Sequence, residues 1–206
     1  MIDFKLYLIT SRALCGAGPV ETVVGQACGA GVRAVQLREK DLSGNELYSL
    51  AVAIREVTKR AGSKLFVNDR ADVALAVGAD GVHCPENGLP VAVARRVCAE
   101  VLVGASAHSQ ERAVEAVTSG ADFVLFGPVF PTPSKAKYGD PQGLEALAGV
   151  ARNAGVPVFA VGGITPENAD LCLERGAAGV GVISAVLSAE DVPGAVEAFR
   201  RSLGTL

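Results

Sequence analysis

The sequence predicts a single-domain α/β protein, folded over residues 1–206 as a (β/α)8 TIM barrel. The first observation is size: the chain has 206 residues, and half of them are apolar. Such a chain can bury one sizeable core without disulfide staples, and it is short for two ordinary domains. The second observation is a repeat in which a short apolar run, a polar or glycine-rich turn and a segment with helical spacing follow one another.

Eight short apolar runs are the expected strands. They are continuously apolar and do not alternate with polar residues, which is typical of strands buried on both faces of a parallel sheet. No run has the character of an edge strand, so we favour the closed barrel over an open doubly wound sheet. The runs cover residues 5–10, 34–37, 64–68, 81–83, 101–105, 123–126, 156–161 and 179–183.

The segments between these runs show the spacing of amphipathic helices. In 45–60, apolar side chains recur three and four residues apart and so share one helical face. Residues 109–118 and 144–154 repeat this pattern. Thr165 followed by Pro166 predicts the start of a further helix, because a capping residue and a proline suit its first turn.

The charge and cysteine content narrow the class of protein. The net charge of −3 and an isoelectric point near 5.5 argue against a nucleic-acid partner or an anionic membrane surface. The five cysteines show no CxxC spacing, so we expect small buried thiols in a reducing cytosol. The first residues lack the basic segment and cleavage site of a signal peptide, and no apolar run approaches a membrane span. We therefore expect a cytoplasmic protein with no membrane partner, and we leave a homodimer open.

Polar and glycine-rich residues gather at one end of nearly every expected strand–helix unit. In a (β/α)8 barrel, ligands bind where the strands end and the following loops begin. These positions are 36–40, 68–70, 83, 106–108, 127–135, 161–164 and 181–185. The segment 127–143 is the longest without strand or helix character and holds four prolines, so it is a candidate active-site loop.

Two anion sites can be argued at this end of the barrel. The first combines Gly162 and Gly163 with Ile183 and Ser184. Glycine lets a phosphate approach the backbone, and helix N-terminal amides donate hydrogen bonds to it. The alternative is that the two glycines simply make a tight turn.

The second anion site is a cluster of cations and neutral donors. Arginine offers a bidentate fork, lysine a mobile charge, and amide or hydroxyl groups add neutral donors. Together they could hold a charge-dense group such as a pyrophosphate. For any one lysine or arginine, a solvated surface charge is the alternative, but here the cations follow separate strands. The cluster consists of Arg38, Lys40, Asn68, Lys135, Thr132 and Ser134.

Asp69 and Gln36 add metal-binding and orienting groups beside this cluster. Asp69 could ligate Mg2+ together with pyrophosphate oxygens, since hard cations take both. An ion pair of Asp69 with Arg38 or Arg70 is the alternative. Gln36 leaves the same strand end as Arg38 and could orient a ring nitrogen or a hydroxyl.

The chain has two histidines, and the sequence predicts different positions for them. We expect His83 to be a packed, hydrogen-bonded residue, and for His108 a packed and a ligand-facing position both stay open. Tyr138 and Asp140 are interpreted as ordinary loop residues. The sequence has no Ser-His-Asp order, zinc-ligand spacing, Walker motif or dinucleotide fingerprint.

Taken in order, the strand-end motifs resemble those of the thiamine phosphate synthase family and of its relatives, the TenI-type thiazole tautomerases. The resemblance covers nearly the whole chain, and the ordered set is specific although each motif alone is weak. The motifs lie at 6–10, 36–40, 67–70, 79–83, 104–108, 127–135, 160–165 and 181–185.

The resemblance implies a barrel that joins hydroxymethylpyrimidine diphosphate to a thiazole phosphate and releases pyrophosphate. It implies that Mg2+ and the catalytic cations Arg38, Lys40 and Lys135 hold the leaving pyrophosphate. A pyrimidine carbocation then forms before the thiazole nitrogen attacks. The matching substrate-binding residues are Gln36, Asn68, Ser106, Thr132 and Ser134, with Gly163, Ile183 and Ser184 at the thiazole-phosphate site. Such catalysis consists of charge neutralisation and positioning, and it needs no general base.

Two positions depart from the patterns of these families. The synthases carry a second Mg2+ carboxylate in the loop after the fourth strand, where this chain has Gly88, so we expect weakened Mg2+ binding unless Glu86 or Asn87 substitutes. The tautomerases rely on a histidine in the loop after the sixth strand, where this chain has Pro128. The synthase set is the more complete. The open alternatives are a thiazole tautomerase with His108 as proton carrier, and a non-catalytic protein that binds thiazole phosphate or thiamine phosphate.

Overall fold

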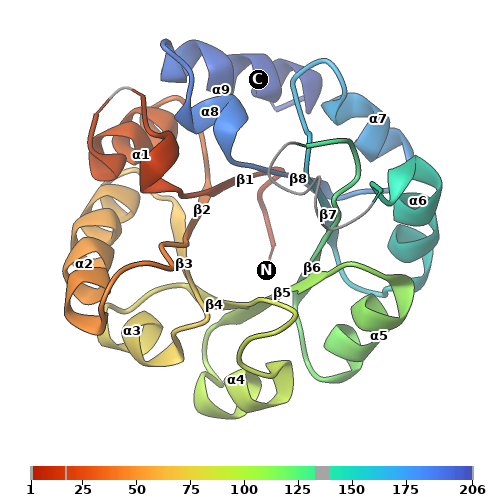
Figure 1. The fold of residues 1–206 in the computed structure, drawn as a ribbon, viewed down its shortest axis with the longest axis horizontal. Helices are drawn as coiled ribbons and strands as arrows, with labels where there is room; N and C mark the ends of the chain where they lie inside the picture. Colours follow the sequence, from red (N-terminus) through yellow and green to blue (C-terminus); the bar gives the residue numbers. More distant parts are fainter. Residues whose placement is uncertain (1, 17, 133–139, 206) are drawn as a thin grey trace.

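Eight parallel strands form a closed barrel in the computed structural model, which describes residues 2–16, 18–132 and 140–205. Each strand pairs with the next one along the chain, and the last pairs with the first. Helices surround this ring, as Figure 1 shows in a view along the barrel. The expected TIM barrel is therefore confirmed. The strands are β1 (Leu6–Ile9), β2 (Ala34–Leu37), β3 (Lys64–Asn68), β4 (Gly81–Cys84), β5 (Leu102–Ala107), β6 (Phe123–Phe126), β7 (Val158–Val161) and β8 (Gly179–Val182).

The strands lie where the apolar runs predict them, with one useful difference. β5 continues past the expected end at residue 105, because Ser106 and Ala107 pair with Leu125 and Phe126 of β6. Ser106 is thus a strand residue and not a loop residue. Its position is set by the rigid barrel wall.

The helices follow the strands in alternation. They are the short 3-10 helix η1 (Arg12–Leu14) and α1 (Val20–Gly29), α2 (Gly44–Arg60), α3 (Ala71–Ala76), α4 (Val91–Val97), α5 (Gln110–Thr118), α6 (Gly143–Asn153), α7 (Ala169–Glu174), α8 (Ser184–Leu187) and α9 (Val192–Ser202). Over the described ranges, none of these helices is long and apolar enough to cross a membrane.

Helix α2 begins with a capping box. The Ser43 hydroxyl accepts a hydrogen bond from the Glu46 amide, and the Glu46 carboxylate accepts one from the Ser43 amide. These bonds satisfy backbone donors that the first turn leaves free. The helix then buries one apolar face, as its spacing predicts.

The expected helix start at Thr165 is wrong, because α7 begins only at Ala169. The residues before it form a turn held by one side chain: the Asn168 amide accepts from the Thr165 backbone N–H at 2.9 Å and donates to the Gly163 carbonyl at 3.0 Å. An asparagine that bonds the backbone in this way competes with helical bonding.

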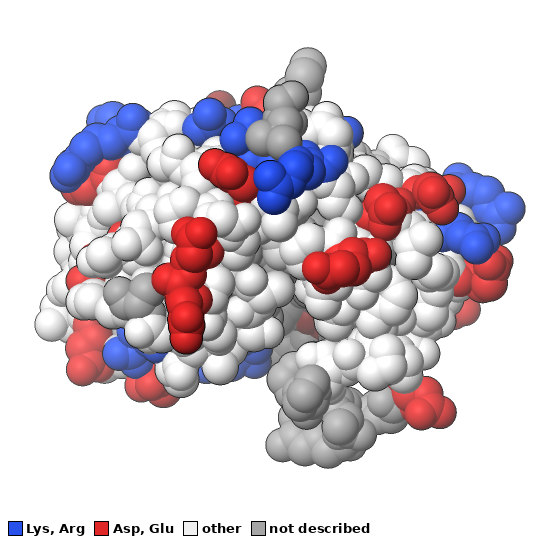
Figure 2. Space-filling model, turned by 90° about the horizontal axis from the view of Figure 1, so that it is seen from above, with Lys and Arg blue, Asp and Glu red and all other residues white. Residues whose placement is uncertain are grey.

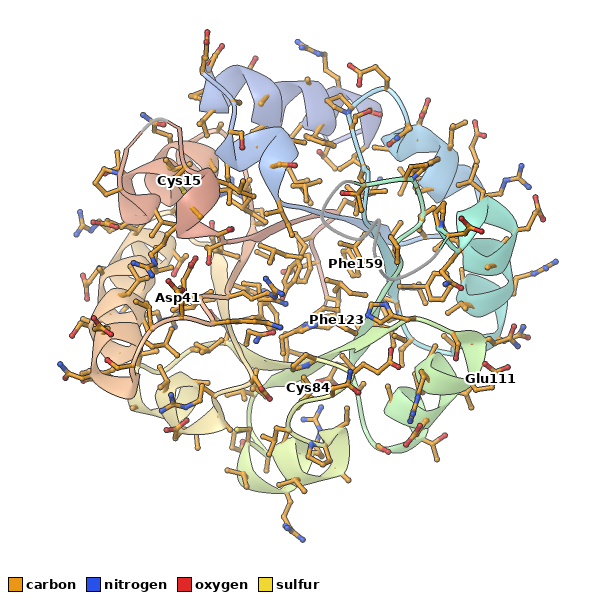
Figure 3. All side chains as sticks on the ribbon, in the orientation of Figure 1. Cys15, Asp41, Cys84, Glu111, Phe123 and Phe159 are labelled. Atoms are coloured by element: carbon orange, nitrogen blue, oxygen red, sulfur yellow. The ribbon has the colours of Figure 1, made fainter. Side chains whose placement is uncertain are left out.

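The barrel interior is an aromatic core, distinct from the aliphatic core between strands and helices. Phe4, Tyr7, Phe66, Phe123 and Phe159 fill it, and neighbouring ring centroids lie between 5.1 and 6.3 Å apart. Figure 3 shows Phe123 and Phe159 inside the ring of strands, whereas Glu111 lies on the outer side. This packed layer closes the barrel, so a ligand can bind only above it, beyond the strand ends.

Two glycines make room for the interior rings. A Cβ atom on Gly81 would lie 2.4 Å from the Phe66 ring, and one on Gly104 would lie 2.3 Å from the Phe123 ring. Large and small residues therefore interlock across neighbouring strands.

The outer surface carries charges of both signs. On the side seen in Figure 2, basic and acidic side chains are interspersed over a largely uncharged surface. All five cysteines are free thiols; four of them are buried, as expected, whereas Cys15 is half-buried.

Candidate active site

A cavity of about 830 Å³ lies at the carboxyl ends of the strands. Its floor is formed by inward-pointing residues of several strands, and its walls come from the loops that follow β2, β3 and β4. Many of the sequence-predicted site residues line it. These are Gln36, Arg38, Lys40, Asn68, Asp69, Ser106 and Ile183.

Other sequence-predicted residues are not brought to the cavity wall. Thr132, Gly163 and Ser184 are described but are not among the residues that line the cavity. Ser134 and Lys135 lie outside the described residues. The roles of all five residues stay predictions from the sequence.

Arg38 and Lys40 are the described cations that stand on the wall without a carboxylate partner. Within the described ranges, neither side chain takes part in an ion pair, whereas Arg12, just outside the cavity, pairs with Glu39 and Asp41. Unpaired cations beside a cavity attract anions and remain available to bind them.

The end of β2 that carries these cations is held firmly. The Thr10 hydroxyl accepts from the Arg38 backbone N–H at 2.9 Å. Both carboxylate oxygens of Glu39 accept from the Arg12 backbone N–H at 3.1 Å. The backbone is therefore fixed, while the Arg38 and Lys40 side chains make no such bond to the described residues.

The floor of the cavity is polar and rests on two buried groups. Gln36 donates from its amide nitrogen to the Tyr7 hydroxyl at 3.4 Å, and Nε2 of His83 lies 2.8 Å from the Ser106 hydroxyl. Burial raises the pKa of Tyr7. Burial, together with the charge of Arg38, lowers the pKa of His83 to about 3. Both groups are therefore neutral near pH 7.

His83 is a packed residue, as expected, whereas His108 is exposed and borders the cavity. Nδ1 of His108 contacts the carbonyl oxygen of Gly127, while the ring borders the cavity. Because a carbonyl oxygen only accepts, His108 carries its hydrogen on Nδ1. Of the two alternatives that the sequence leaves open for His108, the packed position is wrong because the residue is exposed, and the ligand-facing role stays a prediction.

Asp69 has an unusual backbone and a specific partner. Its φ of 59° lies in the left-handed region, and its Oδ1 accepts from the Leu89 backbone N–H at 2.6 Å. The alternative of an ion pair with Arg70 is wrong, since Arg70 pairs with Asp72 at 2.7 Å. An ion pair with Arg38 is likewise not found in the described part of the chain.

Gly88 lies directly against the Asp69 carboxylate. A Cβ atom at position 88 would stand 2.3 Å from Oδ1 of Asp69 and 2.5 Å from Pro85. Any side chain there would displace Asp69 or the loop. The Asp69 carboxylate can take this position only because residue 88 has no side chain, and therefore no second carboxylate.

Glu86 and Asn87 face the same cavity as Asp69, but Glu86 is already engaged. It accepts from the His108 backbone N–H at 3.0 Å and lies 3.5 Å from the Arg112 guanidinium. Within the described ranges, no group of three histidine, cysteine or acidic residues could hold a metal ion. The donors fit an Mg2+ ion that Asp69 shares with phosphate oxygens, not an ion bound by the protein alone.

Gly162 and Gly163 have positive φ values of 93° and 66°. A Cβ on either one would lie 2.6 Å from Pro128 or from the carbonyl oxygen of Pro131. This explains the glycines by a tight turn packed against the loop after β6, so phosphate binding there stays a prediction.

Sequence reasoning missed two participants in the site. Asp140, interpreted as an ordinary loop residue, borders the cavity. Tyr7 lies in the middle of an apolar strand and contacts Gln36. A hydroxyl within an otherwise apolar strand needs a partner when buried, and that signal could have identified Tyr7.

The model of the thiamine monophosphate synthase family matches residues 6–186, which is most of the chain. The chain belongs to the thiamine monophosphate synthase family. This membership confirms the family that the strand-end motifs resemble.

Two curated proteins and one solved structure illustrate the thiamine monophosphate synthase relationship. A putative thiamine-phosphate synthase of Geobacter sulfurreducens is 51% identical over 191 residues, covering 92% of this chain and 90% of the relative. The thiamine-phosphate synthase of Chloroflexus aurantiacus is 40% identical over 200 residues, with coverages of 97% and 93%. The structure of thiamine phosphate pyrophosphorylase from Pyrococcus furiosus superposes with a TM-score of 0.90 at 39% identity, covering 98% of this chain and 96% of that one.

Proposed function

We propose that this chain is a thiamine-phosphate synthase, a transferase of thiamine biosynthesis. It joins hydroxymethylpyrimidine diphosphate to a thiazole phosphate and releases pyrophosphate. The observation that carries the proposal is the cavity wall, where Arg38 and Lys40 stand beside Asn68 and Asp69 and form no ion pair with any residue that the structure describes. This set suits a diphosphate, and the membership of the family supports it.

The reaction exchanges one bond for another. The bond from the pyrimidine methylene carbon to the diphosphate oxygen breaks, and its electron pair leaves with the pyrophosphate. The thiazole nitrogen then gives its lone pair to the same carbon. Arg38, Lys40 and Lys135 neutralise the charge that develops on the leaving group, which is the main contribution such a site can make.

Mg2+ would bind to Asp69 and to the diphosphate. When bound, the ion adds positive charge beside the leaving oxygens. The Leu89 amide holds the Asp69 carboxylate in place. Because Gly88 offers no second carboxylate, binding of Mg2+ should depend strongly on the presence of the diphosphate.

Neutral groups would position the two rings. Gln36 and Ser106 lie on the cavity floor and would orient the pyrimidine, while Asn68 would donate to the diphosphate. Thr132 and Ser134 would add hydroxyl donors from the loop after β6. Gly163, Ile183 and Ser184 would hold the thiazole phosphate.

The partners that we propose are these phosphorylated small molecules, with no nucleic acid. The proposed compartment is the cytoplasm, where free thiols stay reduced.

The decisive experiment is product analysis with both substrates, with and without Mg2+. We expect thiamine phosphate and pyrophosphate in equal amounts, only with both substrates present, and a large loss on chelation. Turnover of the thiazole phosphate alone, unaffected by a chelator, would identify a tautomerase instead. Tight binding without any product would identify a non-catalytic binding protein.

A further inference from the structure

His83 lies one layer below the cavity floor and contacts a residue of that floor. It pairs with Gly104 across the β4–β5 ladder, and Ser106 follows Gly104 at the next inward-pointing position of β5. Ser106 borders the cavity and His83 does not. Nε2 of His83 lies 2.8 Å from Oγ of Ser106, so a direct hydrogen bond joins this imidazole to the cavity floor.

The other nitrogen of His83 has no hydrogen-bond partner among the residues that the structure describes. His83 is 1% exposed, and Nδ1 is the buried side-chain atom without a partner within the described part of the chain. A neutral imidazole carries its hydrogen on one of its two nitrogens. A hydrogen on Nδ1 would leave a buried donor unpaired, which is rarer in proteins than an underused acceptor.

The surroundings of Nδ1 also favour a lone pair there. A Cβ atom on Gly104 would lie 2.8 Å from Nδ1, so the Cα hydrogen that takes this direction in glycine faces Nδ1. A C–H group that faces a lone pair is weakly attracted to it. The same C–H group would be repelled by an N–H group. Both observations place the hydrogen of His83 on Nε2.

We propose that His83 is a positioning residue that donates to Ser106 and thereby directs the Ser106 hydroxyl hydrogen into the cavity. Because the Ser106 oxygen accepts from His83, the hydroxyl hydrogen does not point back at the imidazole and is available to donate to a partner on the substrate side. That partner is an acceptor atom, such as a ring nitrogen of the heterocyclic diphosphate substrate. The inference rests on the proposed function through the role of Ser106 in binding that substrate.

The first test is spectroscopic and needs no turnover. In protein labelled with 15N at histidine, long-range proton–nitrogen correlations report the tautomer of each ring. The chain has two histidines, and we expect opposite tautomers: Nε2–H for His83 and Nδ1–H for His108. Spectra of His83→Gln, or of His108→Gln if the former does not fold, assign the signals. An Nδ1–H tautomer at His83 would overturn the proposal.

The second test is kinetic. Ser106→Ala and His83→Leu should each lower kcat/KM for the pyrimidine diphosphate by about 10-fold, the effect of one ordinary hydrogen bond. The double variant should lose no more than Ser106→Ala alone, because His83 acts through Ser106. His83→Gln, which can still donate to Ser106, should recover most of the loss. KM for the thiazole phosphate should stay unchanged throughout.

Val103→Ala is the matched control. Val103 is buried in the aliphatic core on the outward face of β5, so it should lower the melting temperature and leave kcat/KM unaltered. The proposal would be contradicted if the loss of kcat/KM in the double variant equalled the product of the losses in the two single variants. If the wild-type protein makes no thiamine phosphate, the proposed function fails, and the tautomer of His83 still decides the inference by itself.

Discussion

At the scale of single residues, the site is defined by charges that lack partners. Arg12, Arg70 and Arg112 are neutralised by nearby carboxylates. Arg38 and Lys40, on the cavity wall, have no such pairs in the described part of the chain. Cations left unpaired beside a cavity favour an anionic ligand.

Replacing these cations tests their catalytic role. Arg38→Ala, Lys40→Ala and Lys135→Ala should each lower kcat by roughly 100-fold or more, as is usual when a group that stabilises developing charge is removed. Steady-state kinetics with saturating Mg2+ measures this. Arg96→Ala, an exposed cation on α4, is the control and should keep full activity. Wild-type rates in Arg38→Ala would contradict the mechanism.

Asp69 is the residue that we expect to bind Mg2+. Asp69→Asn keeps the shape but loses the charge, so the Mg2+ concentration for half-maximal rate should rise by about 10-fold or more, as for loss of a carboxylate ligand to a hard cation. A titration with Mg2+ at fixed diphosphate measures the change. Asp72→Asn, on the surface and paired with Arg70, should leave the titration unaltered. An unshifted curve for Asp69→Asn would exclude the metal role.

The buried His83 makes stability depend on pH. Its pKa is about 3 in the folded protein, from burial first and the charge of Arg38 second. The unfolded chain takes up a proton below about pH 6.5 and the folded chain does not, so the free energy of unfolding falls as the pH decreases from about 6.5 toward 3. Between about pH 7.5 and about pH 5, His83 should lower the free energy of unfolding by about 2 kcal/mol. Urea unfolding of the wild type and of His83→Gln at both values measures this as a difference. Equal pH dependence in the two proteins would show that His83 is not buried as neutral imidazole.

At the scale of elements, the loop after β4 and the end of β3 are built as one unit. Asp69 is held in a left-handed conformation by a bond from the Leu89 amide, and Gly88 leaves the space that its carboxylate fills. A carboxylate at position 88 and the observed placement of Asp69 are therefore incompatible.

This leads to a prediction about restoring a second carboxylate. Gly88→Asp should lower the free energy of unfolding by about 1–3 kcal/mol through overpacking, and it should not increase the apparent affinity for Mg2+. Thermal melts and the same Mg2+ titration measure both. Gly29→Ala, at the end of α1 with no heavy atom within 4 Å of the added Cβ, is the control and should be close to neutral. Tighter Mg2+ binding in Gly88→Asp would show that the loop adapts.

At the scale of the whole molecule, the aromatic layer connects barrel closure to the site. The rings of Phe66, Phe123 and Phe159 pack beneath the polar floor, and Gly81 and Gly104 leave space for them. His83 lies in contact with this layer, since its ring centroid is 6.1 Å from that of Phe123. The packing that stabilises the barrel also supports the group that contacts Ser106.

Removing one ring tests this layer. Phe123→Ala should lower the free energy of unfolding by about 3–5 kcal/mol, the usual cost of a large cavity in a core. Denaturant unfolding measures it. Leu75→Ala is the control: Leu75 is 48% exposed, so its change should stay within about 0.5 kcal/mol. A small change in the free energy of unfolding for Phe123→Ala would mean that the neighbouring rings fill the space and that this layer does not determine stability.

Local sequence patterns predicted most of the fold but less of the site. The eight apolar runs predict the strands because buried parallel strands need continuous apolar residues. The start of α7 was wrong because the Asn168 side chain bonds the backbone of the turn before it. The end of β5 was misplaced because Ser106 and Ala107 belong to a ladder with β6 that the local sequence does not reveal.

The sequence by itself determined the barrel, the family and the strand ends where charged and polar residues gather, because periodicity and motif order are properties of the chain alone. The tertiary structure decided which of those residues share one cavity, and which of them have partners. Asp69 pairs with the Leu89 amide and not with Arg70, and His83 contacts Ser106 from below. Such pairings join residues from different strands and loops, and they depend on distances that exist only after the barrel has closed.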